Sequence, residues 1–295
     1  MTMSLRIIFA LVVISGVTGD NNVTTTTPTD AADGPSQPDS LLGSAEKTHV
    51  SGEKVLKEEE AEEHLMASGE LNPNHYPAQR AAKVVQHYLT AHYGSPYRLF
   101  GLQKVFSGNA QDTADSGRKY QLELLVHELI SNATENCSAE VFFAKGEERT
   151  PAQVEVSCKE LIKNNTLDQE EALFQQYKTN QSLLSAHDLP DRYGHMEPDT
   201  KPLWHLGIVA SSFVMLNEST EDTLYNMAQV ANITQLQSDD DVIKFESLVL
   251  LHDMVSQEIP RWKLLFTWSP SEGVKVLQME QLPHCHECEK PLKTD

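Results

Sequence analysis

The chain has 295 residues, enough for two ordinary domains, and 43 Asp and Glu against 23 Lys and Arg give it a formal net charge of −20. This acidic excess argues against binding to nucleic-acid phosphates or to an anionic membrane surface, because both attract clustered Lys and Arg. Hydrophobic residues make up 39% of the chain, which allows folded cores but also predicts that part of the chain is disordered.

The first residues have the pattern of a secretory signal peptide. Arg6 precedes the apolar run Ile7–Ile14, and small residues follow as far as Gly19, which matches a charged start, a short apolar core and a cleavage site. The run is short for a transmembrane helix. We therefore expect residues 1–19 to be removed and the protein to be extracellular and secreted. The alternative is an uncleaved segment that anchors the chain in a membrane.

Residues 20–72 are expected to form a disordered stalk. The Thr-rich run Thr24–Thr29 and the charged run Lys57–Glu60 cannot bury enough apolar surface to offset the entropy of the chain. Seven Asn-x-Ser/Thr sequons agree with secretion and are candidate glycosylation sites. They begin at Asn22, Asn132, Asn136, Asn164, Asn180, Asn217 and Asn232.

Order is predicted to begin near Pro73 with a helix. Apolar residues from Ala81 to Leu89 recur at i, i+3, i+4, i+7 and i+8, and Gly94 with Pro96 ends the pattern. Strand-like runs follow, one of them with the alternation of a half-buried strand. These runs are Leu99–Phe106, Lys119–Ile130, Cys137–Phe143 and Gln153–Cys158.

The same order of elements then occurs again. A helix is predicted from Asp168 to Ala186 and another from Leu203 to Leu216. The strand-like runs that follow are Tyr225–Leu236, Val242–Met254, Arg261–Trp268 and Val274–Met279. A helix followed by about four strands thus occurs twice, which predicts a duplicated α+β unit with a helix packed on a four-stranded antiparallel sheet.

The predicted organisation has four ordered or flexible parts after the stalk. The first copy spans residues 73–165, a connecting helix 166–190, the second copy 191–280 and a flexible tail 281–295. Leu173, Phe174 and Tyr177 lie on one side of the connecting helix. We expect these three side chains to face the two sheets and to join the copies into one block.

Several segments resemble the latexin family. Those that resemble latexin are Tyr76–Ala82, Gly117–Leu122, Asn217–Tyr225 and Leu250–Ile259, and those closer to the secretory retinoic acid receptor responder and ovocalyxin branch are Cys137–Phe143, Gly194–Pro198 and Ser211–Met215. The resemblance covers roughly residues 75–279. It implies two tandem cystatin-like domains joined by a connecting helix. It also implies a protease inhibitor whose partner is a zinc metallocarboxypeptidase of the A type.

The resemblance further implies which residues contact that enzyme. The segment Leu250–Ile259 would form a hairpin loop that enters the active-site funnel. Gln257 is expected at the deepest point, beside Ser256 and Glu258, and His252 is expected as a direct contact or as a residue that fixes the turn. The alternative function is a non-inhibitory extracellular matrix or membrane-associated signalling protein on the same scaffold, because a fold does not decide function.

No enzyme motif is complete. His127-Glu128-Leu129-Ile130-Ser131 begins like a zinc-protease helix, but Ser131 replaces the second His and the run is strand-like. The run Gln103-Lys104-Val105-Phe106-Ser107-Gly108 approaches the Gln-x-Val-x-Gly wedge of cystatins that block papain-like enzymes, but its glycine comes one residue late. We predict no catalytic residue, no metal site and no cofactor.

The four cysteines suggest pairing in a secreted chain. If Val141 faces Val154 across a hairpin, Cys137 faces Cys158 in the same register, at a separation that suits a disulfide. The run His284–Cys288 offers four Cys and His side chains, but their adjacent spacing hardly allows them to surround one tetrahedral zinc ion. A local disulfide or an exposed tail is favoured there.

Overall fold

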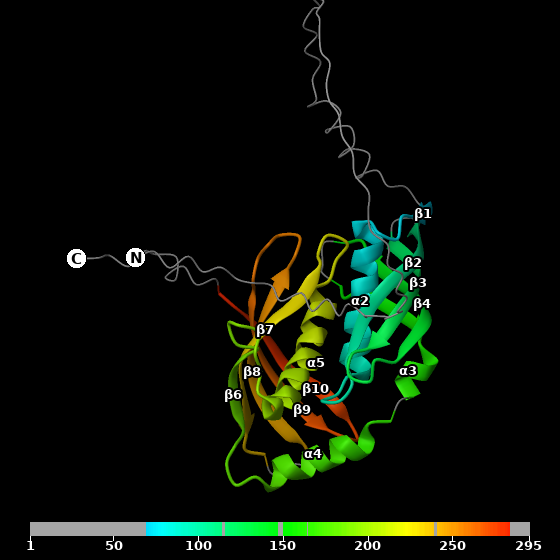
Figure 1. Ribbon diagram of the computed structural model, residues 1–295. Coiled ribbons are helices and arrows are strands. Elements are labelled where there is room, and N and C mark those ends of the chain that lie inside the picture. The colour runs from blue at the N-terminus through cyan, green and yellow to red at the C-terminus, as the bar shows by residue number, and fades with distance from the viewer. Residues whose placement is uncertain (1–68, 114–115, 147–149, 164, 239–240, 284–295) are drawn as a thin grey trace, which may run out of the picture. The chain divides into compact units, whose positions relative to one another are not determined.

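The computed structural model describes residues 69–113, 116–146, 150–163, 165–238 and 241–283. The expected signal peptide, most of the expected stalk, and Asn22, Asn164, Cys285 and Cys288 lie outside these residues. In the described part, two five-stranded antiparallel sheets each lie against a long helix (Figure 1). The fold is α+β, as predicted.

The first half is built on helix α2 (Tyr76–Tyr93), which has Pro near its start and ends at Gly94. Its buried face is rich in alanine, and such small side chains let the sheet approach the helix closely. The sheet has the order β1-β2-β3-β4-β5. Its strands are β1 (Gly69–Leu71), β2 (Phe100–Thr113), β3 (Gly117–Glu128), β4 (Thr134–Ala144) and β5 (Gln153–Ser157).

The second half is built on helix α5 (Lys201–Glu218), which follows the short 3-10 turn η1 (Pro198–Thr200). The order of its sheet is β10-β9-β8-β7-β6. Its strands are β6 (Ser185–Leu189), β7 (Tyr225–Leu236), β8 (Ile243–Asp253), β9 (Arg261–Ser269) and β10 (Gly273–Leu282). Helices α3 (Lys159–Lys163) and α4 (Leu167–Thr179) lie between the two halves in sequence.

The second half repeats the first in detail. Both long helices have 18 residues. When the chain is counted from the first residue of each helix, two register shifts of the first hairpin fall at the same positions in both halves. These shifts lie between Leu102/Lys104 and Val105/Ser107 in one half and between Met227/Gln229 and Val230/Asn232 in the other. The predicted duplication is therefore present in both helix length and strand register.

The two helices pack against each other in opposite directions. Arg80, near the start of α2, donates a hydrogen bond of 2.8 Å to the carbonyl of Glu221, just past the end of α5. In the same way, His205 near the start of α5 lies 2.5 Å from the carbonyl of Pro96, just past the end of α2. These contacts occupy equivalent positions of the repeat, so the two halves hold each other reciprocally.

Three predicted boundaries were wrong. Each sheet has five strands rather than four, because β1 and β6 each add a strand beside the first strand of the hairpin. The three-residue strand β1 is too short to show a period and had been assigned to the stalk. The connecting helix ends at Thr179 instead of 190, since residues 185–189 pair with β7, and β10 continues to Leu282 in the predicted tail.

The connecting helix contributes to only one core. Leu173, Phe174 and Tyr177 are buried, as predicted, but they belong to the core of the second half. The rings of Phe174 and Trp268 lie 5.8 Å apart, edge to face. Leu99, which precedes β2, also belongs to this core. The expectation that α4 faces both sheets is therefore corrected, because its apolar side meets the second sheet.

Candidate docking loop between strands β8 and β9

The loop that joins β8 to β9 is an exposed tip on a buried base (orange in Figure 1). His252 and Asp253 end β8 and are buried, whereas Met254 to Glu258 are exposed. Main-chain bonds close the base, with the N–H of Asp253 donating to the carbonyl of Glu258 at 3.1 Å and that of Leu251 to Pro260 at 3.0 Å. The exposed tip is therefore short and held at both ends.

The carboxylate of Asp253 organises the tip. It accepts main-chain N–H groups of Leu224 at 2.9 Å and Val255 at 3.1 Å, and the hydroxyl of Ser256 at 2.8 Å. Burial alone would raise the pKa of Asp253, but these hydrogen bonds outweigh burial and lower its pKa, so the group is charged at neutral pH. A carboxylate with three donors fixes the turn before any partner arrives.

Gln257 adopts a left-handed backbone conformation, with φ of 61°. Its main-chain N–H donates to the carbonyl of Asp253 at 2.9 Å, and its side-chain Nε2 donates to the carbonyl of Met254 at 2.6 Å. The side-chain nitrogen is thus directed at the loop itself. The side-chain oxygen remains as the acceptor that this exposed amide can offer to a partner.

The segment that follows α5 connects the tip to the first half. Leu224 accepts the N–H of Met254 at 3.0 Å in addition to binding Asp253. Three residues earlier, the Glu221 carboxylate accepts the hydroxyl of Tyr120 at 2.5 Å and lies 3.8 Å from Arg118. Burial, followed by this bond to Glu221, raises the pKa of Tyr120. Both halves therefore contribute to the position of the loop.

Comparison with known proteins identifies the family. The family model named Latexin matches residues 71–286. The chain belongs to the latexin family. It is 35% identical to latexin of Mus musculus over 215 residues, which covers 72% of this chain and 97% of that one. It is 32% identical to retinoic acid receptor responder protein 1 of Homo sapiens, covering 72% and 73%, and 30% identical to ovocalyxin-32 of Gallus gallus, covering 70% and 74%.

Latexin-family proteins are inhibitors rather than enzymes, in agreement with the incomplete catalytic motifs of this sequence. Among solved structures, mouse fetuin-B aligns with 74% of this chain and 72% of its own, at 11% identity and a TM-score of 0.22. These values are too low to support an argument about fold or partner. The assignment to the latexin family therefore rests on the sequence matches.

The four segments that resemble latexin meet around the loop. Arg80 comes from the first, Tyr120 from the second, Glu221 with Leu224 from the third, and Asp253 from the fourth. Contacts between these segments cross more than one hundred residues of sequence in two cases. The features that mark the latexin family in this chain therefore build and support one loop.

The residues predicted to contact a partner have different positions. Ser256, Gln257 and Glu258 lie on the exposed tip. His252 is only 7% exposed, so little of its side chain is open to a partner, and both of its predicted roles stay predictions. Asp253 was not among the predicted site residues. The sequence does indicate its role, because Asp253 stands three residues before Ser256, and an Asp at this spacing commonly accepts hydrogen bonds from the turn that follows it.

The predicted disulfide is present. Val141 pairs with Val154 as expected, and Cys137 is bonded to Cys158 with a Cα separation of 5.0 Å. Glu135 lies beside these sulfur atoms. Its carboxylate accepts main-chain N–H groups at the start of α3, however, including that of Leu161 at 2.8 Å. Among the described residues, these three are the only group whose side chains could together hold a metal ion, and all three are already engaged in structural bonds.

The two incomplete motifs, the zinc-protease run and the cystatin-like run, both begin within strands. His127 and Glu128 lie at the end of strand β3 and not on a helix, so they cannot present the ligand geometry of a zinc protease. Gln103 to Gly108 lie inside β2, where Gly108 pairs with Leu122. The turn of this hairpin comes after Thr113. This run therefore cannot act as the wedge of a papain-type inhibitor, and the strand predicted to end at Phe106 continues to Thr113.

The described sequon asparagines differ in how accessible they are. Asn132 and Asn136 are exposed on the β3–β4 loop and on β4. Asn180 is exposed at the end of α4, and Asn232 is exposed on β7, where its side chain accepts the N–H of Leu248 at 3.1 Å. Asn217 is half-buried and donates to Glu218 at 3.0 Å. Whether any of them carries a glycan stays a prediction.

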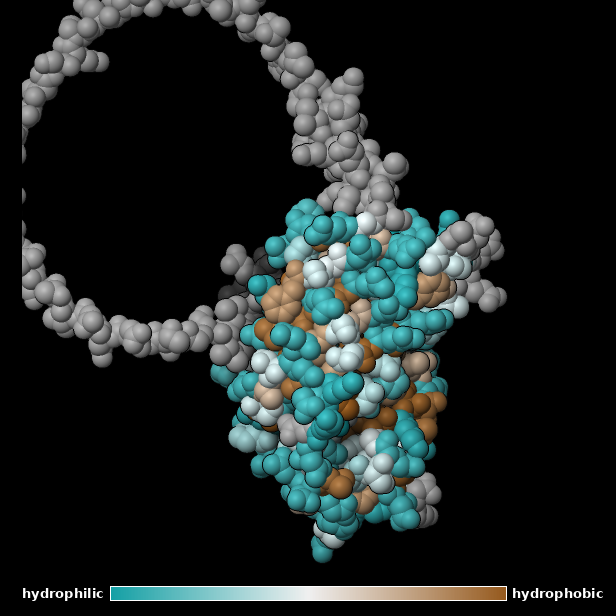
Figure 2. All heavy atoms as spheres, turned by 90° about the vertical axis from the view of Figure 1, so that its right-hand side faces the viewer, coloured by the Kyte–Doolittle hydropathy of each residue, from teal (hydrophilic) through white to brown (hydrophobic). Residues whose placement is uncertain are grey.

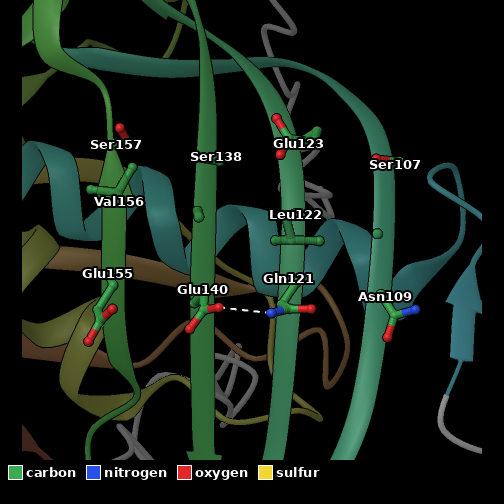
Figure 3. Close-up of a pocket in the computed structure, with 12 residues that line it drawn as sticks. Ser107, Asn109, Gln121, Leu122, Glu123, Ser138, Glu140, Glu155, Val156 and Ser157 are labelled. Atoms are coloured by element: carbon green, nitrogen blue, oxygen red, sulfur yellow. Dashed lines mark hydrogen bonds between the residues drawn. The ribbon is translucent and has the colours of Figure 1, made fainter.

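A second candidate surface lies on the open face of the first sheet. Figure 2 shows this side of the protein as mainly hydrophilic, with hydrophobic residues in smaller patches. A shallow hollow of about 560 Å³ crosses β2 to β5, and Figure 3 shows short Ser side chains along it beside three glutamates, Glu123, Glu140 and Glu155. Hydrogen bonds from Lys119 and Gln121 lower the pKa of Glu140. Side chains on such a shallow, solvated sheet face do not converge on one point, so we do not take it as the functional site.

Within the described ranges, no helix is long and apolar enough to cross a membrane. The N-terminal apolar run, on which the predictions of secretion and of membrane anchoring both depend, lies outside those ranges.

Proposed function

We propose that this chain inhibits a zinc metallocarboxypeptidase of the A type by inserting the β8–β9 loop into the active-site funnel. Membership of the latexin family supports a protease as the partner. The observation that carries the proposal is the tip itself, in which Asp253 fixes the exposed residues Met254 to Glu258. A loop that is ordered before binding avoids much of the entropy cost of docking.

The chemistry of the tip suits a funnel with a metal at its base. Met254 and Val255 are exposed apolar side chains that gain free energy when a narrow entrance covers them. Gln257 adds a neutral amide whose oxygen can accept a hydrogen bond from groups around the metal. Glu258 places one carboxylate at the rim, and the positive charge of the zinc ion at the base of the funnel would attract it.

We also propose two finer properties of the chain. The two halves would be cystatin-like domains, which the repeated helix and sheet support. The protein would be secreted after removal of residues 1–19, which the disulfide supports because such bonds persist in oxidising compartments. Sequencing the N-terminus of protein released by a mammalian cell would test secretion, and a retained full-length chain would contradict it.

The test of inhibition is the double variant Gln257→Ala with Glu258→Ala, titrated against pancreatic carboxypeptidase A. Loss of a contact at the centre of an interface raises the inhibition constant by about 10- to 100-fold, equivalent to roughly 1.4–2.8 kcal/mol. The matched control is Glu171→Ala with Gln175→Ala, because these are the same residue types, exposed on α4. The control should inhibit like the wild type.

Two outcomes would refute the proposal. If the wild type fails to slow carboxypeptidase A at micromolar concentration, this enzyme is not the partner. If the wild type inhibits and the Gln257 and Glu258 double variant inhibits equally well, the β8–β9 loop is not the contact surface. Circular dichroism and thermal melting of each variant would show that the fold is kept, which is expected because both positions are exposed.

A further inference from the structure

The docking loop has a structural copy in the first half. The β3–β4 loop, Glu128 to Ala133, occupies the same place in the repeat as Asp253 to Glu258 in the second half. In both loops the first residue is a buried acid that ends a strand. In both, the fifth residue has a left-handed backbone, with φ of 59° at Asn132 and 61° at Gln257.

The hydrogen bonds of the two loops also correspond. The carboxylate of Glu128 accepts the main-chain N–H groups of Leu99 at 3.1 Å, Ile130 at 2.9 Å and Ser131 at 2.7 Å. Their repeat equivalents are Leu224, Val255 and Ser256, whose main-chain N–H groups donate to the Asp253 carboxylate at 2.9, 3.1 and 3.4 Å. Main-chain closure is the same, since the N–H of Glu128 donates to the carbonyl of Ala133 at 2.8 Å.

The electrostatics of the two acids match as well. Burial alone would raise the pKa of Glu128, but hydrogen bonds from Ser131, Ile130 and Leu99 outweigh burial and lower its pKa. Glu128 is therefore charged at neutral pH, like Asp253, and it fixes its loop by the same means. The first half thus has a second tip that is ordered before any partner binds.

The two tips present the same kind of side chain to solvent. Leu129 and Ile130 are 46% and 42% exposed, and Met254 and Val255 are 47% and 43% exposed. Two adjacent aliphatic side chains on a fixed tip form a small apolar patch that a partner can cover. Each pair is followed by Ser and then by a residue with a neutral amide, Asn132 or Gln257.

The two tips lie at opposite ends of the helix pair. The β3–β4 loop is bonded to Leu99, beyond the end of α2, and the β8–β9 loop to Leu224, beyond the end of α5. Because α2 and α5 are antiparallel and have 18 residues each, the tips are separated by about the length of such a helix, ~27 Å. Two partners can therefore bind without sharing a surface.

We propose that the β3–β4 loop is a second docking loop, and that one chain binds two molecules of the same class of protease, one at each tip. This inference rests on the proposed function of the β8–β9 loop. The first tip has Ala133 where the second has Glu258, so it lacks the carboxylate at the rim. Its affinity for the enzyme should be the weaker of the two for that reason.

The experiment measures how many enzyme molecules each chain binds. The full chain, produced without N-glycans because Asn132 is also a sequon, is mixed with excess pancreatic carboxypeptidase A and weighed by native mass spectrometry. The wild type should bind two molecules. The variant Leu129→Ser with Ile130→Ser and the variant Met254→Ser with Val255→Ser should each bind one.

Single substitutions give the same test if one of these double variants fails to fold. Ile130→Lys and Val255→Lys form a matched pair at equivalent exposed positions, and each should remove one enzyme molecule and leave the melting temperature unchanged. The Glu171→Ala and Gln175→Ala variant should still bind two molecules, because its changes lie on α4.

The outcomes separate the two proposals. One bound enzyme that is lost with the Met254 and Val255 changes, and kept with the Leu129 and Ile130 changes, overturns the second docking loop but supports the proposed function. One bound enzyme with the opposite dependence supports docking at the β3–β4 loop and overturns the assignment of the β8–β9 loop. If the chain binds no enzyme at any ratio, both proposals are overturned.

Discussion

The two halves share one backbone plan and fill it with different side chains. In the first half the helix face is lined with alanines, and a disulfide between Cys137 and Cys158 joins β4 to the residue after β5. In the second half Trp262 occupies the position that is equivalent to Cys137, and the core contains more aromatic rings than the first. One strand register can therefore be stabilised either by a covalent link or by the burial of large rings.

The difference follows from what covers each sheet. The first core contains small residues of α2 and closes around the disulfide. The second core also receives α4, whose Phe174 and Tyr177 pack edge to face on Trp268. The extra helix brings more apolar area to the second half, and buried apolar area is the main source of folding free energy. We expect the second core to tolerate loss of a ring less well than the first tolerates loss of an aliphatic group.

The largest effect is expected from matched truncations in the two cores. Phe266 and Val141 are equivalent in the repeat, and both are fully buried. Phe266→Ala should lower the free energy of unfolding by about 3–5 kcal/mol, and Val141→Ala by about 1.5–3 kcal/mol. Urea unfolding followed by fluorescence would measure both. Equal losses from these unequal truncations would mean that the first core loses more free energy per atom removed, which would contradict the expectation.

The next effect concerns the covalent link. The variant Cys137→Ala with Cys158→Ala opens a closed segment with a sequence separation of 21, which should cost about 3 kcal/mol through the entropy of the unfolded chain. As a comparison, the wild type is reduced with dithiothreitol, which should lower its free energy of unfolding in urea by a similar amount. A shift below a few tenths of a kcal/mol in both cases would show that the first half does not depend on its disulfide.

A smaller effect should appear on changing pH. His87 of α2 is fully buried against β7, with Nε2 3.1 Å from the carbonyl of Tyr225. Burial first, and then the charge of Lys83, lower the pKa of His87 to about 3, although the bond to Tyr225 opposes this. Since an unfolded His has a pKa near 6.5, the unfolded state binds a proton that the folded state rejects between pH 6.5 and 3. Stability should therefore fall as the pH falls through this window.

The expected slope is about 0.7 kcal/mol per pH unit at pH 6.5, where half of the unfolded chains carry the proton, and it approaches about 1.4 kcal/mol per pH unit near pH 5. Urea unfolding at pH 6.5, 6.0, 5.5 and 5.0 would measure it above the range where most carboxylates titrate. The second half has Ser212 at the equivalent position, but burial also lowers the pKa of His205 in that half and of His92 in the first. His87→Gln should therefore reduce the slope, and a variant that keeps the full slope would assign it to these other histidines.

Most of the fold could be predicted because its long elements have clear periods. The strand Tyr225–Leu236 has the predicted bounds, and α2 and α5 lie within two or three residues of theirs. The short strands β1 and β6 were missed because three to five residues show no period of their own. They form only because a longer strand, β2 or β7, offers a free edge beside them.

The site was predicted less completely, for a physical reason. The exposed residues Gln257 and Glu258 could be placed by resemblance, but the role of Asp253 depends on Leu224, which is 29 residues from Asp253 in sequence. The near-miss zinc motif was rejected correctly, yet the actual role of Glu128 required the bond to Leu99. Contacts of this range leave no periodic signal in a sequence.

The smallest effect sharpens the comparison of the two loops. Gln257 and Asn132 both have φ near 60°, a region that costs an ordinary residue about 1–2 kcal/mol and that Asn tolerates better than Gln. Gln257→Gly relieves that strain but makes the unfolded chain more flexible, which cancels about 0.5–1 kcal/mol. Asn132→Gly gains less relief for the same cost. We therefore expect the change in the free energy of unfolding to be about 0.5 kcal/mol more favourable for Gln257→Gly than for Asn132→Gly.

This small difference matters for the test of function, because glycine keeps the left-handed turn and removes the side chain. If Gln257→Gly melts like the wild type and yet inhibits carboxypeptidase A more weakly, the loss belongs to the amide and not to a distorted loop. A large drop in the melting temperature would show instead that the bond from Gln257 to Met254 maintains the turn. In that case the side chain would be structural, and Met254 with Val255 would remain as the contact residues of the tip.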